Sequence, residues 1–268
     1  MTELIEADTR LEAWISATKP LLDTDYKQDI ILHINSPSKK HSLEDEICEK
    51  LDTHYDNADM DPINTIAETI FPASLYRDKN FSIEEVYDDY LEQLEIILQR
   101  SNGYNWGTYF ERMIQRIDPE TGDTFNPLQK TIEKLDRANS PEGHPFKACY
   151  EINLQGTSSD VALYQGASDR QQTRNLPCLS HLSFKLFDET VHLTAFYRSH
   201  DYRFKVPGNL LGLARLQDCV ANEVEADSGQ LVIHSSKASI ASGPPEGEFR
   251  TIVDNFSKSV NNTSLGDF

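Results

Sequence analysis

Residues 175–209 read NLPCLSHLSFKLFDETVHLTAFYRSHDYRFKVPGN, and this stretch decides the fold prediction. Two runs within it, residues 181–187 and 192–198, alternate apolar and polar side chains as half-buried strands do. An Arg-Ser-His-Asp cluster follows the second run, and a Pro-Gly-Asn turn follows the cluster. The stretch therefore predicts two strands of a sheet that lead directly into polar side chains.

Outside this stretch, the period of the apolar residues changes from helical to strand-like near residue 146. Strands are also predicted at residues 146–154 and 230–240. Helices are predicted at residues 43–52, 62–71, 83–100, 108–117, 127–138 and 208–226. Ser42 with Asp45, and Ser82 with Glu85, are typical of capping arrangements at helix N-termini.

The remaining segments are polar. The first sixty residues carry one helix signal only, residues 118–126 and 155–174 are predicted loops, and the tail from residue 243 is rich in Gly and Pro, then weakly helical. No repeat or linker splits the chain. We expect one α+β domain with a polar N-terminal segment and short helix at 1–61, a core at 62–242 and a tail at 243–268.

Composition excludes several classes of protein. The chain has 268 residues and a formal net charge of −19, which argues against binding a nucleic acid polymer. No apolar run approaches the ~20 residues needed to cross a bilayer, and the acidic start lacks the layout of a signal peptide, so we expect a cytoplasmic protein. Four separated cysteines without a CxxC pair favour a single reactive thiol over a disulfide or zinc site.

No metal site is predicted. The acidic run at residues 52–61 lacks the glycine and terminal glutamate of a calcium-binding EF-hand loop and reads as a solvated loop. His181, His192 and His200 lack the spacing of metal ligands and are typical of packing or surface residues.

Four polar residues of the 175–209 stretch suit one reaction, the attack of a thiolate on C6 of a pyrimidine nucleotide. Cys178 supplies the nucleophile, and Arg198 binds phosphate and lowers the thiol pKa if it lies nearby. Ser199 adds a hydroxyl donor, and the amide of Asn209 bonds both a carbonyl and a ring N–H of the base.

The spacing of these residues resembles thymidylate synthase. In that family the catalytic cysteine follows a proline, a phenylalanine lies six positions on, an Arg-Ser-x-Asp group begins twenty positions on, and a Pro-Phe-Asn turn ends the pattern. Cys178, Phe184, residues 198–201 and residues 207–209 satisfy this register without a gap. The resemblance extends over residues 62–241 and is specific over 175–241.

Upstream, three further residues enter through the resemblance. Glu68, in NTIAETIF, is similar to the family's glutamate that organises water and assists proton transfer. Trp106, followed by glycine, resembles the Tyr-Gly element near the cofactor. Lys147 stands where the family donates an arginine across the dimer to the phosphate. In the same family Asp201 contacts the folate pterin.

The sequence also departs from the family. The histidine and tyrosine that hold the sugar hydroxyl fall at Ser239 and Ala241, Lys205 replaces a glycine, and Leu179 replaces the histidine after the catalytic cysteine. The folate-stacking tryptophan and the N-terminal phosphate-binding arginine loop have no counterpart. These departures favour a divergent relative over a housekeeping thymidylate synthase.

The resemblance implies a thymidylate-synthase-like α+β fold with a large twisted mixed sheet covered by helices, and a homodimer. It implies transfer of a methyl or hydroxymethyl unit from 5,10-methylenetetrahydrofolate to C5 of a pyrimidine nucleoside monophosphate. The choice between uracil and cytosine, between ribose and deoxyribose, and between the two products stays open, although asparagine at position 209 favours uracil. The alternatives are a degenerate nucleotide-binding protein of the same fold and a folate-independent reaction at C5 or C6.

Each candidate residue also has a purely structural interpretation. Cys178 is then a buried thiol, and Arg198 with Asp201 a strand-end ion pair. Asn209 is then the cap of a helix that begins at Leu210, and Glu68 a solvated helix residue.

Overall fold

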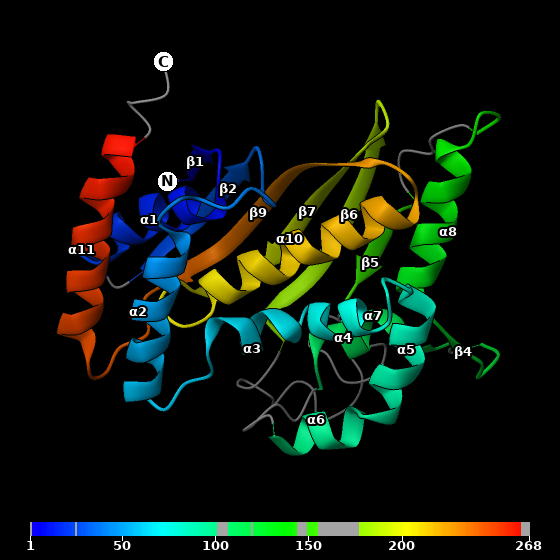
Figure 1. Ribbon diagram of the computed structural model, residues 1–268, viewed down its shortest axis with the longest axis horizontal. Coiled ribbons are helices and arrows are strands. Elements are labelled where there is room, and N and C mark those ends of the chain that lie inside the picture. Colours follow the sequence, from blue (N-terminus) through cyan, green and yellow to red (C-terminus); the bar gives the residue numbers. More distant parts are fainter. Residues whose placement is uncertain are drawn as a thin grey trace. The chain divides into compact units, whose positions relative to one another are not determined.

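The computed structural model describes residues 2–24, 26–100, 107–118, 120–143, 149–154 and 177–263. Helices cover a large mixed sheet (Figure 1), so the predicted α+β class is confirmed. The strands are β1 (Glu3–Ala7), β2 (Tyr26–Ile34), β3 (Arg116–Ile117), β4 (Thr124–Phe125), β5 (Glu151–Asn153), β6 (Leu179–Phe187), β7 (Thr190–Tyr197), β8 (His200–Asp201) and β9 (Asp227–Ser239). The helices are α1 (Arg10–Leu21), α2 (Glu44–Asn57), α3 (Ile63–Glu68), α4 (Ala73–Asp78), α5 (Ile83–Glu92), α6 (Leu94–Arg100), α7 (Tyr109–Ile114), α8 (Pro127–Asn139), α10 (Val206–Glu223) and α11 (Glu246–Thr263).

The main sheet has seven strands in the order β1-β2-β9-β7-β6-β5, and β8 pairs with β9. Strand β1 runs parallel to β2, and β8 runs parallel to β9, whereas β2 with β9 and β5 with β6 are antiparallel. Strands β3 and β4 form a separate two-stranded ribbon. The chain divides into two compact units, and each is considered by itself.

The first unit is built from described residues of Met1–Ala67, Phe196–Arg215 and Gly229–Phe268. Helix α1 packs on β1 and β2, and α11 packs on α1 and α2. Trp14 of α1 is 2% exposed and meets the ring of Phe249 of α11 edge-on at 6.3 Å. Burial of such aromatic side chains supplies much of the hydrophobic stabilisation of a domain.

Residues 3–34 form β1, α1 and β2, for which the sequence analysis predicts no element. The polar composition of this segment is misleading, because it still buries apolar side chains such as those of Ile5, Trp14 and Leu32. Thr9 and Glu12 form a full capping box at the start of α1: the Thr9 side chain accepts from the Glu12 N–H, and the Glu12 carboxylate accepts from the Thr9 N–H.

The second unit is built from described residues of Glu68–Ala195 and Leu216–Ser228. Helix α8 packs on β5 and β6 and also on α7, and α4 packs on α5. Phe110 is fully buried, and the rings of Phe71 and Tyr90 meet it edge-on at 5.8 Å and 4.8 Å. Within the described residues, no helix of either unit is long and apolar enough to cross a membrane.

Most predicted elements of the second half are present with shifted ends. The predicted strands correspond to β5, β6, β7 and β9, and the helices predicted at 127–138 and 208–226 correspond to α8 and α10. The weakly helical tail is α11, a helix of 18 residues. The insertion predicted as a loop at 155–174 lies outside the described residues.

Three helix predictions are wrong in detail. The helix predicted at 83–100 is two helices, α5 and α6, because the chain leaves the helix at Gln93, and Ser82 makes no side-chain capping bond. The helix predicted at 108–117 ends at Ile114 because the next residues pair as β3 with β4. Helix α2 begins after Leu43 and not at a Ser42 cap.

The turn between β6 and β7 yields a stability prediction. Asp188 and Glu189 are the only residues between the two strands, and their φ angles are 47° and 59°. Two positive φ angles define a type I′ turn, in which glycine is favoured at the second position and an L side chain is strained. We expect exposed Glu189→Gly to raise the free energy of unfolding by about 0.5–1 kcal/mol in urea titrations, and Glu189→Val to lower it by a similar amount. Equal stabilities of the two variants would contradict this reading of the turn.

Candidate functional site

The predicted phosphate-binding pair lies in the first unit, at the end of β7. Arg198 and Ser199 are half-exposed. The Ser236 hydroxyl of β9 donates to the carbonyl of Arg198 at 3.0 Å and to that of Tyr197 at 3.3 Å. The neighbouring strand therefore fixes the backbone here, and binding of phosphate by Arg198 and Ser199 stays a prediction.

Asp201 of β8 ties this segment to the loop after β9. Its Oδ1 atom accepts the backbone N–H of Arg203 and that of Ala241, both at 3.0 Å. Burial raises the pKa of the Asp201 carboxyl, and these N–H donors act in the opposite direction. The backbone N–H of Phe204 also bonds this carboxylate, and contact of Asp201 with a pterin ring stays a prediction.

Asn209 lies inside the first turn of α10. Because the helix begins at Val206, Asn209 does not cap a helix that starts at Leu210, and that alternative is wrong. The Asn209 side chain is 4% exposed, and its Nδ2 atom lies 3.0 Å from Nε2 of His200. Reading of a base by Asn209 stays a prediction.

Gly208 explains one departure from the family pattern. A Cβ atom at this position would lie 2.5 Å from Cβ of Ile66 and 2.8 Å from the carbonyl oxygen of Ile63. Helix α3 therefore approaches the start of α10 too closely for any side chain. The phenylalanine of the family's Pro-Phe-Asn turn does not fit here.

Arg203 is a buried residue that the sequence analysis missed. Its Nη1 atom donates to the carbonyls of Ala241 and Gly243, and its Nε–H donates to Nε2 of His54. The guanidinium carbon stacks 4.5 Å from the ring centroid of Phe204. Burial lowers the pKa of Arg203, and the nearby charge of Asp201 opposes that shift. Asp201 and Arg203 together hold the loop that carries Ala241.

His54 extends this arrangement to the surface of the unit. The guanidinium of Arg203 has only donors, so Nε2 of His54 is the acceptor, and Nδ1 of His54 carries the ring proton. Nδ1 lies 3.0 Å from Oε2 of Glu248 on α11. The His54 ring also stacks on Phe204 with an interplanar angle of 2°. In the sequence, the one indication of a role for Arg203 is that it lies two residues after Asp201.

Cys178 lies in the second unit, immediately before β6. Its side chain is half-exposed, so it is not a sealed structural thiol. The backbone N–H groups of Cys178 and Leu179 both donate to the hydroxyl of Tyr109, at 3.2 Å and 3.3 Å. Buried Tyr109 on α7 therefore fixes the backbone that carries the thiol.

Glu68, the last residue of α3, also belongs to the second unit. Its carboxylate accepts the backbone N–H of Ser74 at 3.3 Å and the Ser74 hydroxyl at 3.1 Å. Glu68 thus holds the first turn of α4, and a proton-relay role stays a prediction.

The structure gathers four predicted residues, Arg198, Ser199, Asp201 and Asn209, in one segment of the first unit. Cys178 and Glu68 are in the second unit. Trp106 and Lys147 lie outside the described residues. Within the described ranges, no group of three or more His, Cys, Asp or Glu side chains is arranged to hold a metal ion.

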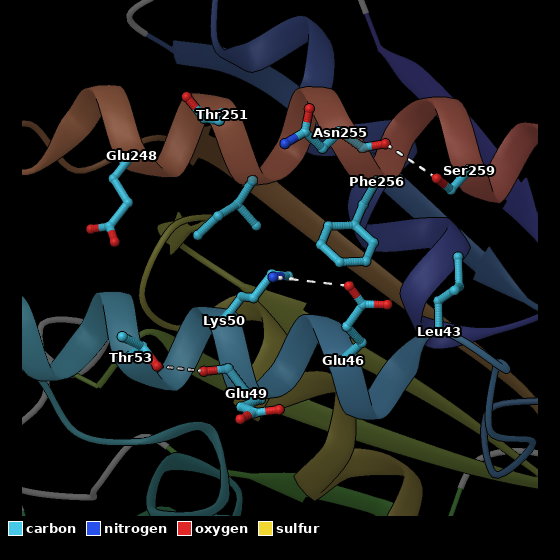
Figure 2. Close-up of a pocket in the computed structure, with 11 residues that line it drawn as sticks. Leu43, Glu46, Glu49, Lys50, Thr53, Glu248, Thr251, Asn255, Phe256 and Ser259 are labelled. Atoms are coloured by element: carbon cyan, nitrogen blue, oxygen red, sulfur yellow. Dashed lines mark hydrogen bonds and ion pairs between the residues drawn. The ribbon is translucent and has the colours of Figure 1, made fainter.

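The groove between α2 and α11, shown in Figure 2, does not suit a nucleotide. It has a volume of about 760 Å³, and none of the predicted site residues lines it. Glu46, Glu49 and Glu248 contribute negative charge, and Lys50 points at Glu46 at a distance of 3.9 Å. A phosphate would be repelled by these carboxylates.

Comparison with known proteins finds relatives of part of the chain. No protein-family model matches it. Over 65 residues, 24% of this chain and 30% of the relative, it is 42% identical to a protein of Methanococcoides burtonii named "Putative thymidylate synthase". A protein of the same name from Methanosarcina mazei is 38% identical over 69 residues, 26% of this chain and 32% of the relative. One from Methanothermobacter thermautotrophicus is 42% identical over 65 residues, 24% and 29% of the two chains.

The chain thus spans about 30% of the length of the curated relatives that it matches. Over that part, which is about a quarter of this chain, the similarity supports the thymidylate synthase superfamily.

Proposed function

We propose that the protein transfers a one-carbon unit, methyl or hydroxymethyl, to C5 of a pyrimidine nucleoside monophosphate. The observation that carries the proposal is the segment from the end of β7 to the first turn of α10. It places half-exposed Arg198 and Ser199, the Asp201 carboxylate and the buried Asn209 amide in one unit. The partial relatives named as thymidylate synthases support the same class of reaction.

In this proposal the Cys178 thiolate forms a bond to C6, and the ring electron pair moves to C5, which becomes nucleophilic. Arg198 and Ser199, with Lys147, hold the phosphate, and Asn209 reads the base edge. After C5 gains its substituent, its proton leaves to solvent, and the bond between sulfur and C6 breaks as the ring double bond re-forms. Glu68 relays the proton.

Bound 5,10-methylenetetrahydrofolate would supply the one-carbon unit as a methylene group: the folate would also give up a hydride to yield methyl and leave as dihydrofolate, or water would add to yield hydroxymethyl and the folate would leave as tetrahydrofolate. The Asp201 carboxylate would accept a pterin N–H donor, and Trp106 is the proposed aromatic contact. The Asp201 carboxylate also holds the Arg203 and Ala241 N–H groups, so a change there would disturb the loop as well as the cofactor.

We further propose that the protein is a homodimer that packs sheet against sheet. Alternate residues of β6 and β7 are buried, and those between them are half-exposed or exposed, including His181, Ser183 and His192. A sheet face that stays half-exposed in one chain is a surface that a second copy can cover. Sedimentation velocity should give a mass near 61 kDa, twice the 30.5 kDa of the chain, and a 30.5 kDa species at micromolar concentration would contradict the proposal.

The test of activity is release of tritium from C5-labelled dUMP, UMP, dCMP and CMP, with and without methylenetetrahydrofolate. We expect folate-dependent release from at least one of the four. Release that needs no folate would indicate exchange or dehalogenation chemistry instead. Tight nucleotide binding with no release from any substrate would favour the second candidate function.

That second candidate is a nucleotide-binding protein of the same fold that has lost catalysis. The residues at positions 239 and 241 favour it. Ala241 cannot replace the tyrosine that helps to hold the sugar hydroxyl in the family, because its backbone N–H and carbonyl are bound by Asp201 and Arg203 and its side chain is a methyl group. Ser239 offers a short hydroxyl in place of the family's histidine.

A further inference from the structure

A chain of four buried polar side chains leads from Asn209 into the core of the first unit. Asn209 Nδ2 lies 3.0 Å from His200 Nε2, His200 Nδ1 lies 2.9 Å from Ser235 Oγ, and Ser235 Oγ lies 3.1 Å from the Tyr202 hydroxyl. All four residues are at most 4% exposed. Such a network can be satisfied by two arrangements of protons, because the imidazole has two neutral tautomers and the Ser235 and Tyr202 hydroxyls can each donate or accept.

The position of the His200 proton follows from its neighbours. The ring is stacked on Tyr197 at 3.8 Å, and burial lowers the pKa of His200 to about 3, so the imidazole is neutral at physiological pH. A neutral imidazole carries one proton. With Nδ2 of Asn209 facing Nε2, as in the structure, Nε2 accepts and Nδ1–H donates to Ser235; the Nε2–H tautomer would require the amide turned over.

In the Nδ1–H tautomer the Asn209 amide has one favourable orientation. Rotation by 180° would bring Oδ1 against the unprotonated Nε2, which places two acceptors in contact. In the observed orientation one Nδ2 proton is used by His200, and the second proton and Oδ1 form the other edge of the amide. In the proposed function, this second edge of the amide meets the base.

We propose that His200 is a positioning residue that sets the order of Oδ1 and Nδ2 at the base-reading edge, and so restricts the site to one of the two pyrimidine bases. Uracil presents an N3–H donor beside the O4 acceptor, whereas cytosine presents the N3 acceptor beside the N4 amino donor. One amide orientation matches one base, and the flipped orientation matches the other. This inference rests on the proposed function, in which Asn209 meets the base.

The test compares wild-type protein with His200→Leu, which removes the acceptor at similar size, and with His200→Gln, whose side-chain oxygen can still accept from Asn209. Dissociation constants for dUMP, dCMP, UMP and CMP are measured by calorimetry without folate, and thermal unfolding confirms that each variant is folded. We expect the wild type to prefer one base by about 10–100-fold. The preference should fall to about threefold or less in His200→Leu and return in His200→Gln.

Two results would overturn the inference and leave the proposed function intact: wild-type protein that binds both bases equally, or a folded His200→Leu variant that keeps the full preference. If none of the four nucleotides binds to wild-type protein, the proposed function itself fails, and the selectivity fails with it. A measurement without nucleotide tests the role of His200 separately from the proposed function. Nitrogen-15 NMR of the imidazole should show the Nδ1–H tautomer for His200, and an Nε2–H tautomer would overturn the inference whatever binds.

Discussion

Cys178→Ala is expected to abolish tritium release from the C5-labelled substrate, by a factor of about 10³ or more. Without the sulfur no bond forms at C6, so C5 never becomes nucleophilic and its proton is not exchanged. Nucleotide affinity should change much less, because the phosphate and the base are held by Arg198, Ser199 and Asn209 in the proposal. The measurement is the initial rate of release at saturating nucleotide and methylenetetrahydrofolate, with nucleotide binding measured in parallel.

Cys48→Ala and Cys149→Ala are the matched controls. Cys48 is a poor nucleophile, because burial raises the pKa of its thiol to about 12 and leaves it protonated at neutral pH. Cys149 is half-exposed, like Cys178, but has no place in the proposed reaction. Both variants should keep the wild-type rate. A Cys178→Ala variant that still releases tritium, or a Cys149→Ala variant that does not, would contradict the assignment of the nucleophile.

The sequence is a good guide where a strong periodic pattern coincides with a long element. β7 alternates along its whole length and β6 from Ser180 on, and α10 carries Leu210, Leu213 and Leu216 on one buried face. In these elements local pattern and tertiary burial agree, so a prediction from periodicity is confirmed with shifts of a few residues at the ends.

The sequence does not predict β1, α1 and β2, because charged residues interrupt their apolar patterns. Arg10 is a buried charge inside α1, and Pro20 lies inside the same helix, so the segment reads as irregular. One signal was present: Thr9 followed three residues later by Glu12 is a capping box that forms. Ser82 and Glu85 have the same spacing but form no capping box, since the Ser82 side chain makes no capping bond. The chain enters this helix through Asn80 and Phe81, whose φ angles are 51° and 64°. Spacing alone does not separate the two.

Spacing in the sequence identifies the predicted site residues, but it does not identify the side chains that they contact. Asn209 is nine positions after His200, but the Ser235 hydroxyl lies beside the His200 ring because β8 pairs with β9 in parallel, with His200 opposite Ala238. Such a contact depends on strand register across more than thirty residues, which no local pattern contains. The same reason hides Arg203, whose partners lie on α2 and in the loop after β9.

The buried imidazole of His200 is expected to make stability depend on pH. Its pKa in the folded protein is about 3, whereas an unfolded histidine has a pKa of 6.5. Between these values the unfolded chain binds one more proton than the folded protein. The stability that the neutral, buried His200 ring allows is therefore complete above pH 6.5 and is lost as the pH falls toward 3. The loss is about 1.4 kcal/mol per pH unit in that window, and roughly 5 kcal/mol in total.

Neighbouring titratable groups also make stability depend on pH, so the prediction concerns the difference in free energy of unfolding between the wild type and one variant. Asp201 acts in the opposite direction, because burial raises its carboxyl pKa and a falling pH then favours the folded form in which that carboxyl is protonated. His200→Gln removes the titrating ring, keeps an acceptor for Asn209 and leaves Asp201 in place. Urea unfolding of both proteins from pH 4 to pH 7 should show the stability of the wild type rising relative to the variant by about 1.4 kcal/mol per unit up to pH 6.5 and then levelling off. Parallel curves would mean that the ring is solvated or charged in the folded state. In that case Asn209 would have no neutral acceptor beside it, and the amide would be free to turn.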